Sequence, residues 1–420
     1  VTADDISPAV ARDYAHLGPL FEHFHANPEL SFVEHKTAAR LAQELRDAGA
    51  EVTEGVGGTG VVGVVKNGDG PVVLVRADMD GLPIKENSGL PYASAATQVD
   101  IDGNEFPVMH ACGHDVHIVA LVGTLRELMR RRDEWQGTLL LIGQPAEERI
   151  GGARKMMADG LYERFPRPDF ALALHVSSLM ETGKFRLDPG ITFSSSDSID
   201  IIVPGVGTHG ASPQLGKDPI VIASQIVLAL QTLIARETSP FDPGVVTVGS
   251  FHAGTKHNII PDQAKLQLTV RSNDVQVRNA LLNGIRRIAE NIGRAAGLPE
   301  DNLPRVTEPL SSTPPTLNEP ALTARITAAL ETRFGPGRFV TGPRKGMGAE
   351  DFAYFLAVEP PVPGAYFRVG GTPKAAFDAE AAGGPRVSGH HSPLFKISPK
   401  PAITYGVEAM TAAVLELLGK

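Results

Sequence analysis

The chain has 420 residues, of which 42% are hydrophobic and 21% are charged, and its formal net charge is −9. A chain of this length exceeds what one hydrophobic core usually supports, so we expect two folded domains. The acidic balance and the lack of any lysine- or arginine-rich run argue against nucleic acid as a partner and favour a small molecule.

The start of the chain bears on localisation. Residues 1–5 have neither the basic nor the apolar region of a signal peptide, and no segment approaches the roughly 20 uninterrupted apolar residues that span a bilayer. We therefore expect a soluble protein without a membrane partner, cytoplasmic rather than exported. Because the first residue is Val1, removal of an export signal stays open. The single cysteine, Cys112, excludes an intramolecular disulfide.

The first half of the chain alternates predicted helices with predicted strands. Helical periodicity covers residues 36–48, 116–131 and 152–159, and short apolar runs typical of strands cover 60–65, 71–76, 138–142 and 170–174. This alternation predicts an α/β fold, a mixed sheet with helices on both faces.

The pattern changes near residue 192. Strands are predicted over 198–203, 245–250 and 265–270, and helices over 219–237 and 275–295. The β-α-β-β-α order fits a separate α+β two-layer sandwich, which closes near the proline-rich stretch 310–320. We therefore predict one domain from residues 1–191 and 312–420, interrupted by an inserted domain over 192–311.

Side chains that can bind metal follow the predicted strands, where open α/β sheets place their ligand sites. Cys112 and His114 flank one glycine just before a helix, and a thiolate with an imidazole suits zinc or a similar divalent metal. Glu147 and Glu148 would repel each other unless a cation lies beside them. Glu148 could then bind the metal while Glu147 transfers protons. The alternative for this pair is a solvated acidic turn neutralised by nearby arginines.

Two further histidine positions extend this cluster. His175 ends the predicted strand 170–174, where a lone histidine is more often satisfied within a core than bound to metal. The other polar residues favour a ligand instead. The pair His390 and His391 precedes Ser-Pro, a rigid loop that could complete the coordination shell from the far end of the chain.

Short motifs in a fixed order carry a resemblance to a known family. They are FHANPELSFVEHKT (24–37), VRADMDGLP (75–83), MHACGHDVH (109–117), QPAEE (144–148), LHV (174–176), THGASP (208–213), DPI (218–220), NIIPD (258–262), MGAEDFAYF (347–355) and HHSPLF (390–395). The chain resembles the metallo-amidohydrolases that include hippurate hydrolase, N-acyl-amino-acid amidohydrolases and auxin-conjugate hydrolases, within the clan of aminoacylase and glutamate carboxypeptidase.

The resemblance implies two divalent metal ions, zinc by default with manganese, cobalt or nickel as alternatives. It implies that the ligands are Cys112, His114, Glu148, His175 and His391. His391 is preferred to His390 because it directly precedes Ser-Pro. A metal-activated water would attack the amide carbonyl of an N-acyl amino acid, with Glu147 as general base and later acid. The expected products are a carboxylic acid and a free amino acid.

The resemblance also implies that the inserted domain is a lid and the surface of a homodimer. His209 would stabilise the oxyanion, with the partner subunit as one source of this residue. Asn258 and Arg271 would hold the substrate carboxylate; Arg271 suits bidentate recognition, and its alternative is a surface arginine. Asp78 and Asp80 would orient the metal ligands.

Two other functions stay open. A metallo-dipeptidase or carboxypeptidase would share this chemistry and differ only in its pocket. A catalytically silent metal-binding scaffold would keep the ligands without the reaction, but the presence of Glu147 beside all five candidate ligands argues against it.

Overall fold

The computed structural model describes residues 7–309, 311–344 and 346–420. The chain divides into two compact units. Unit 1 comprises Val1–Thr192, Leu317–Arg344 and Tyr354–Lys420, and unit 2 comprises Phe193–Thr316 and Lys345–Ala353. The mixed α/β class predicted from the sequence is confirmed, with a large mixed sheet and helical cover in unit 1.

Unit 1 is built on a mixed sheet of seven described strands in the order β1-β2-β6-β3-β7-β18-β8. The four neighbours β6, β3, β7 and β18 run parallel, whereas β1, β2 and β8 add antiparallel pairings at the two edges. The strands are β1 (Glu51–Val56), β2 (Gly60–Asn67), β3 (Val72–Asp78), β6 (Gly137–Gln144), β7 (Phe170–Glu181), β8 (Phe185–Arg186) and β18 (Gly364–Thr372).

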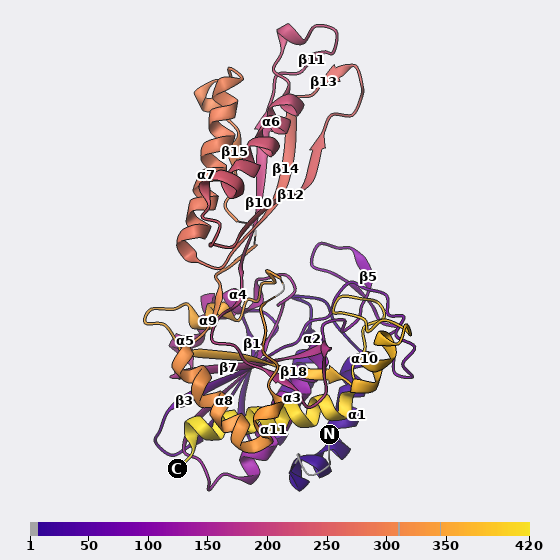
Figure 1. The fold of residues 1–420 in the computed structure, drawn as a ribbon, viewed down its shortest axis with the longest axis vertical. Helices are drawn as coiled ribbons and strands as arrows, with labels where there is room; N and C mark the ends of the chain where they lie inside the picture. Colours follow the sequence, from indigo (N-terminus) through magenta and orange to yellow (C-terminus); the bar gives the residue numbers. More distant parts are fainter. Residues whose placement is uncertain (1–6, 310, 345) are drawn as a thin grey trace. The chain divides into compact units, whose positions relative to one another are not determined.

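Helices from both ends of the chain share one hydrophobic core with this sheet. The core helices are α1 (Pro8–Ala26), α2 (His35–Asp47), α3 (His114–Arg130), α8 (Pro320–Phe334) and α11 (Pro399–Leu418). They fully bury Leu17, Leu41, Leu125, Ile326 and Val414, one from each helix. α11 packs against both α3 and α8 (Figure 1). The two ends of the chain therefore fold into one core.

The shorter elements of the chain fill the loops between these. They are β4 (Thr97–Val99), β5 (Glu105–Pro107), α4 (Gly152–Ala158), α5 (Leu161–Arg164), β9 (Gly190–Phe193), β17 (Thr316–Asn318), α9 (Ala353–Leu356) and α10 (Lys374–Ala381).

One strand is longer than its sequence pattern indicates. The apolar run of β7 stops at Leu174, and the sequence therefore predicts that the strand ends at His175. The observed strand continues to Glu181, because its parallel ladder with β18 extends from Ala171 to Glu181. The prediction of a strand end was wrong, and His175 lies inside a paired strand, opposite Arg368 of β18.

Unit 2 is an antiparallel sheet with two helices on it. The strand order is β12-β14-β10-β15, with β16 also pairing with β10. The strands are β10 (Ser195–Pro204), β12 (Gly244–Ala253), β14 (Gln263–Ser272), β15 (Arg305–Val306) and β16 (Ser311–Thr313). The helices α6 (Pro219–Thr232) and α7 (Val275–Ala295) bury their apolar faces on the sheet in a second core.

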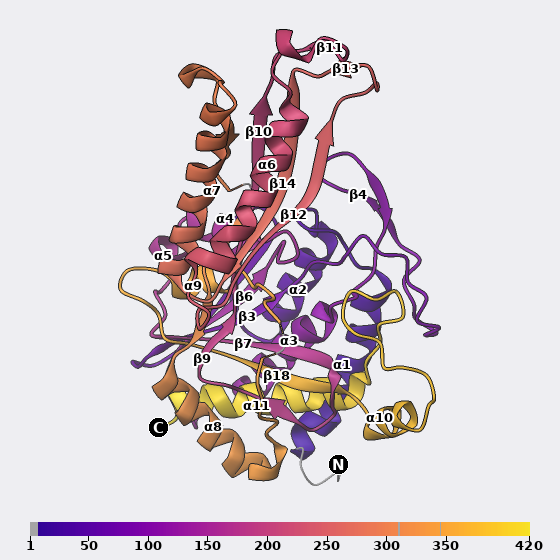
Figure 2. The same cartoon turned by 45° about the horizontal axis from the view of Figure 1, so that its top comes forward.

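Three local features mark the helices and one end of unit 2. α6 continues into a π-helical turn over Leu233–Glu237, and α7 starts where the Asp274 side chain accepts the first free backbone N–H groups of the helix. A separate small pair, β11 (Thr208–His209) and β13 (Ile259–Ile260), lies at one end of the unit in both views (Figure 1 and Figure 2).

Two helical stretches are long and apolar enough to cross a membrane by composition alone, Pro219–Glu237 and Pro399–Leu418. The second is α11, with 78% of its apolar window buried in the core of unit 1, whereas 33% of the first window is buried. The core helix of a globular protein passes the same test, so these stretches are weak evidence for a membrane span.

Candidate active site

The side chains predicted to bind metal meet in unit 1, beside the ends of β3 and β6. In each of three overlapping groups, the potential ligand atoms lie within 4.8 Å of one another. The groups are Cys112 with His175 and His390, Cys112 with Glu148 and His391, and His114 with Glu147 and Glu148. Because the groups share Cys112 and Glu148, the five predicted ligands and Glu147 form one contiguous cluster.

A glycine turn sets the positions of the first two ligands. Gly113, between Cys112 and His114, has φ +84°, and a Cβ there would lie 2.4 Å from a methyl group of Val176. Only glycine fits both the left-handed backbone and the close approach of β7. The turn therefore brings the thiol and the imidazole to one side of the sheet, just where α3 begins.

The hydrogen bonds of His114 fix its tautomer. Its Nδ1 lies 2.8 Å from the backbone carbonyl of Asp80, so Nδ1 carries the proton and donates it. The other nitrogen, Nε2, is buried and has no hydrogen-bond partner among the residues that the structure describes. It lies 3.7 Å from Asp78 Oδ2 and 3.8 Å from Glu148 Oε1. An unpaired buried nitrogen facing two carboxylates is suited to a metal ligand.

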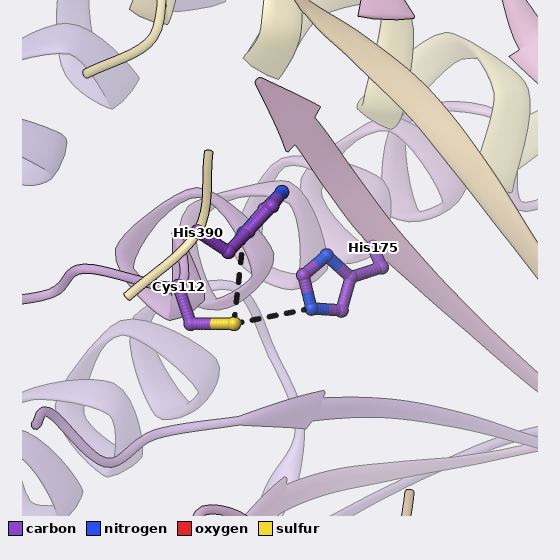
Figure 3. Close-up of side chains that lie close together, drawn as sticks. All are labelled: Cys112, His175 and His390. Atoms are coloured by element: carbon purple, nitrogen blue, oxygen red, sulfur yellow. Dashed lines mark hydrogen bonds between the residues drawn. The ribbon is translucent and has the colours of Figure 1, made fainter. Parts of the chain in front are cut away.

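Figure 3 shows two imidazoles that point at the Cys112 sulfur. His175 Nε2 lies 3.5 Å from Sγ, and its Nδ1 donates to the Val176 carbonyl oxygen at 2.6 Å. His390 has the opposite tautomer: its Nε2 accepts the Ser178 N–H at 3.3 Å, so the proton is on Nδ1, 3.6 Å from Sγ. His175 thus offers a lone pair to a metal, whereas His390 offers a proton to the sulfur.

The loop after β6 is held by Asp80. The Asp80 carboxylate accepts the backbone N–H groups of Glu147 and Glu148, each at 3.1 Å, and the Ser31 hydroxyl at 2.6 Å. Ala146, just before them, has φ +48°, a conformation that such bonds must stabilise. Asp80 thereby fixes both glutamates and, through its carbonyl, His114.

His391 reaches the cluster from the far end of the chain. Its backbone has φ +62° and its N–H donates to the Ala111 carbonyl oxygen at 2.8 Å. Its Nε2 lies 3.3 Å from Glu148 Oε1, and its side chain is 54% exposed. Of the two adjacent histidines, His391 therefore faces the carboxylate and His390 faces the thiol.

The electrostatics of the cluster fit divalent cations. Burial, and then the carboxylates of Glu148 and Glu147, raise the pKa of the Cys112 thiol well above its ordinary value. Burial alone would lower the pKa of His114, but neighbouring carboxylates, Asp78 foremost, raise it to about 10. Neighbouring carboxylates contribute to both shifts, and a bound cation would neutralise their negative charge. The donor set of sulfur, imidazole and carboxylate fits a transition-metal ion such as zinc.

The three predicted residues of unit 2 do not come together within one chain. His209 and Asn258 are neighbours, because β11 pairs with β13 and Gly210 N donates to the Asn258 carbonyl oxygen at 2.8 Å. Arg271 lies toward the opposite end of β14, eight residues after Gln263, or about 26 Å at roughly 3.3 Å per residue. Asn258 and Arg271 of the same chain are therefore too far apart to bind one carboxylate.

Two residues that the sequence reasoning did not assign support the site. His117 accepts a backbone N–H of β7 on Nε2 and donates from Nδ1 to Asp78 Oδ1 at 2.6 Å. Glu34 accepts the Ala146 N–H at 2.8 Å, and burial together with Asp80 raises its pKa to about 7. His117 was detectable from its place one helical turn after His114. For Glu34, no sequence pattern other than its place in the motif at 24–37 indicated a role in the site.

Comparisons with known proteins agree with this geometry. The profile of peptidase family M20/M25/M40 matches residues 74–383. Hippurate hydrolase of Campylobacter jejuni is 38% identical over 336 residues, 80% of this chain and 83% of that protein. Thermostable carboxypeptidase 2 of Saccharolobus solfataricus is 37% identical over 351 residues, 82% and 83% of the two chains. The crystal structure of a dinuclear metal-binding peptidase of the M20 family from Bacillus subtilis superposes with a TM-score of 0.74 at 28% identity, covering 96% of this chain and 98% of that chain.

A thiol, imidazoles and carboxylates gathered beside the ends of parallel strands define a metallohydrolase site. The chain belongs to peptidase family M20/M25/M40, which confirms the resemblance seen in the motifs. The protein is accordingly an amidohydrolase that uses two divalent metal ions.

Proposed function

We propose that the protein hydrolyses the amide bond of N-acyl amino acids and releases a carboxylic acid and a free amino acid. The observation that carries this proposal is the position of Glu147. One of its carboxylate oxygens lies within 4.8 Å of the potential ligand atoms of His114 and Glu148, while its backbone is fixed by Asp80. A carboxylate beside a metal pair, but not needed to complete it, is placed for proton transfer.

The proposed metal ligands are Cys112, His114, Glu148, His175 and His391. The proposed ions are zinc, with manganese, cobalt or nickel as alternatives. When bound, such ions lower the pKa of water and polarise the substrate carbonyl group. The tautomers of His114 and His175 support their assignment, because each donates its Nδ1 proton to a backbone carbonyl and keeps Nε2 available.

Residues of the chain would then transfer the proton, position the catalytic glutamate and stabilise the thiolate. Glu147 takes a proton from the attacking water and delivers it to the leaving nitrogen. Asp80 keeps Glu147 in place during both transfers, because it binds the backbone of that loop. His390, through its Nδ1 proton, stabilises the thiolate form of Cys112.

Unit 2 is proposed to act as a lid and to form a homodimer. Among the described strands, β12 lies at the edge of its sheet, and Phe251 on this strand is 39% exposed. On α6, Val221 is 53% exposed and Leu228 is 73% exposed. An unpaired strand edge beside an apolar helix face favours pairing with a second copy. Sedimentation at micromolar concentration is expected to give a dimer that the Leu228→Glu variant weakens, and a wild-type monomer would refute the interface.

The separation within unit 2 supports a role for the partner subunit. We propose that Arg271 holds the substrate carboxylate together with Asn258 of the partner subunit, and that His209 of the partner subunit stabilises the oxyanion. Mixing inactive Arg271→Ala and His209→Ala chains should restore part of the activity, because a mixed dimer then contains one complete site. The absence of restored activity in dimers shown to exchange chains would contradict this arrangement.

A second candidate is cleavage of a peptide at its carboxyl end, favoured by the 37% identity to a relative named carboxypeptidase. A panel of benzoyl-glycine, acetyl-methionine, an aromatic N-acyl amino acid and a dipeptide separates the two. Release of amino acid from the acylated compounds, lost on chelation and restored by metal, is the expected result. Activity confined to the dipeptide would replace the proposed function by the second candidate.

A further inference from the structure

A cavity of about 270 Å³ in unit 1 is lined by an unusual concentration of arginine. Arg186 and Arg368 come from the neighbouring strands β8 and β18. Arg344 follows a segment that lies beside β8, where Phe339 bridges to Phe185 and the Gly342 carbonyl oxygen accepts from Arg186. Asp188 is the only acidic side chain among the residues that line it. Positive charge therefore exceeds negative charge inside a concave site, which is suited to an anion.

The register of the sheet connects this cavity to the metal cluster. Arg368 is the direct partner of the proposed metal ligand His175 across β7 and β18, and Arg186 is the direct partner of Arg368 across β18 and β8. Paired residues project from the same face of a sheet, with strands about 4.8 Å apart. Tyr366, which also lines the cavity, has its ring 6.4 Å from the His175 ring between centroids.

The three arginines carry like charges and repel one another. Two like charges directly opposite each other on paired strands are destabilising, and burial with the Arg186 charge lowers the pKa of Arg368. Burial and Arg368 likewise lower the pKa of Arg344. Asp188 pairs with Arg186 and offsets part of this repulsion, but it is 40% exposed. An anion placed among the three guanidinium groups would lower the repulsion between them further.

We propose that this cavity is an anion-binding subsite of the active site, and that it takes a second carboxylate carried by the substrate. This proposal rests on the proposed function, since it names the class of N-acyl amino acid that the site prefers: one with a carboxylate on the amino-acid side chain or at the far end of the acyl group. A planar carboxylate matches the forked donors of arginine. A free dicarboxylic acid offers the same chemistry and would occupy the same place.

The test compares charged substrates with neutral substrates of the same shape. N-acetyl-glutamate is paired with N-acetyl-glutamine, and N-succinyl-methionine with its terminal amide. In the metal-loaded wild-type enzyme, kcat/KM for the charged member of at least one pair should be about tenfold higher or more, the range of one charge-assisted hydrogen bond. The preference ratio is kcat/KM for the charged substrate divided by kcat/KM for its neutral partner. The Arg368→Gln variant should bring this ratio close to one, and Arg368→Lys should keep part of the wild-type preference.

Asp188→Asn gives a test with the opposite sign, because it removes the acidic side chain and should raise the same ratio. Arg325→Gln is the matched control, since Arg325 is 46% exposed on α8 and pairs with Glu416. This control should leave the ratio unchanged. A ratio that stays high in Arg368→Gln would overturn the proposal, because the preference would then come from another part of the enzyme.

A second measurement detects a free acid. Succinate should raise the thermal unfolding midpoint of the wild-type holoenzyme more than that of Arg368→Gln. If the wild type shows no preference for the charged substrates, this difference between the two midpoint shifts would assign the cavity to a free dicarboxylate. Equal behaviour of wild type and Arg368→Gln in both measurements would overturn the subsite. If no acylated compound is cleaved, the proposed function fails, and the succinate measurement still decides whether the cavity binds anions.

Discussion

His25 is enclosed by two carboxylates, and this arrangement gives a prediction with a definite sign. The side chain is 3% exposed, with Nδ1 at 2.7 Å from Asp115 Oδ2 and Nε2 at 3.1 Å from Glu86 Oε1. Its ring packs edge-on against Tyr92. Burial alone would lower the pKa of His25, but the hydrogen bonds to Asp115 and Glu86 raise it to about 10. The imidazolium therefore holds α1 to the start of α3.

The His25→Phe variant keeps a ring in this place and removes the charge. Two buried carboxylates would then lack their cation, and breaking a buried pair in this way costs about 3–5 kcal/mol of unfolding free energy. A matched control is His16→Phe. His16 pairs with Glu44 at 2.7 Å but is 39% exposed, and an exposed pair contributes about 0–1 kcal/mol.

The pH dependence follows from the raised pKa of His25. The folded state holds the proton up to about pH 10, whereas the unfolded chain releases it near pH 6.5. The stabilisation is complete below about pH 6.5 and is lost as the pH rises through about 10. The difference in unfolding free energy between wild type and His25→Phe should therefore shrink steadily across that interval.

Urea unfolding of the holoenzyme at several pH values measures this difference. Trp135 is the single tryptophan of the chain and is buried in the core of unit 1, so its fluorescence follows the unit that contains His25. A His25→Phe variant no less stable than His16→Phe would refute the reasoning. So would a difference from wild type that grows between pH 7 and pH 10.

Three further results are expected. Gly113→Ala should lose about 1–3 kcal/mol of unfolding free energy, because of its positive φ and the contact with Val176. Gly103 has φ +85° and no neighbour within 4 Å among the described residues, so Gly103→Ala should lose less, and equal losses would contradict the steric argument. Cys112→Ser should lower the metal content measured by elemental analysis, and unchanged stoichiometry and affinity would remove Cys112 from the ligands. Chelation should lower the unfolding midpoint of unit 1, because metal binds the folded state more tightly, and an unchanged midpoint would contradict a site formed by folding.

Much of the α/β class could be read from the sequence, because buried parallel strands have continuous apolar runs and surface helices have a 3.6-residue period. The helix predicted over 275–295 is observed as Val275–Ala295. The end of β7 could not be predicted. Beyond Leu174 the strand is fixed by its pairing with β18, a segment nearly 200 residues later in the chain, and no local pattern reports that pairing.

In the candidate site, too, the sequence predicts some features and only the fold determines others. Motifs brought Cys112, His175 and His390 to attention, but the distinct tautomers of the two histidines depend on backbone groups of β7 that meet them only in the fold. The arginine cavity gave no signal at all, since Arg186 and Arg368 lie far apart in the sequence and face each other only through strand register.

The central claim is that Glu147 transfers the proton at a two-metal site, and the Glu147→Gln variant tests it most directly. The wild type and the variant are loaded with the same metal, and kcat on an N-acyl amino acid and the metal content are measured for each. We predict a fall in kcat of about a hundredfold to ten-thousandfold, with two metal ions per chain retained. A variant that keeps two ions and nearly wild-type kcat would contradict the account.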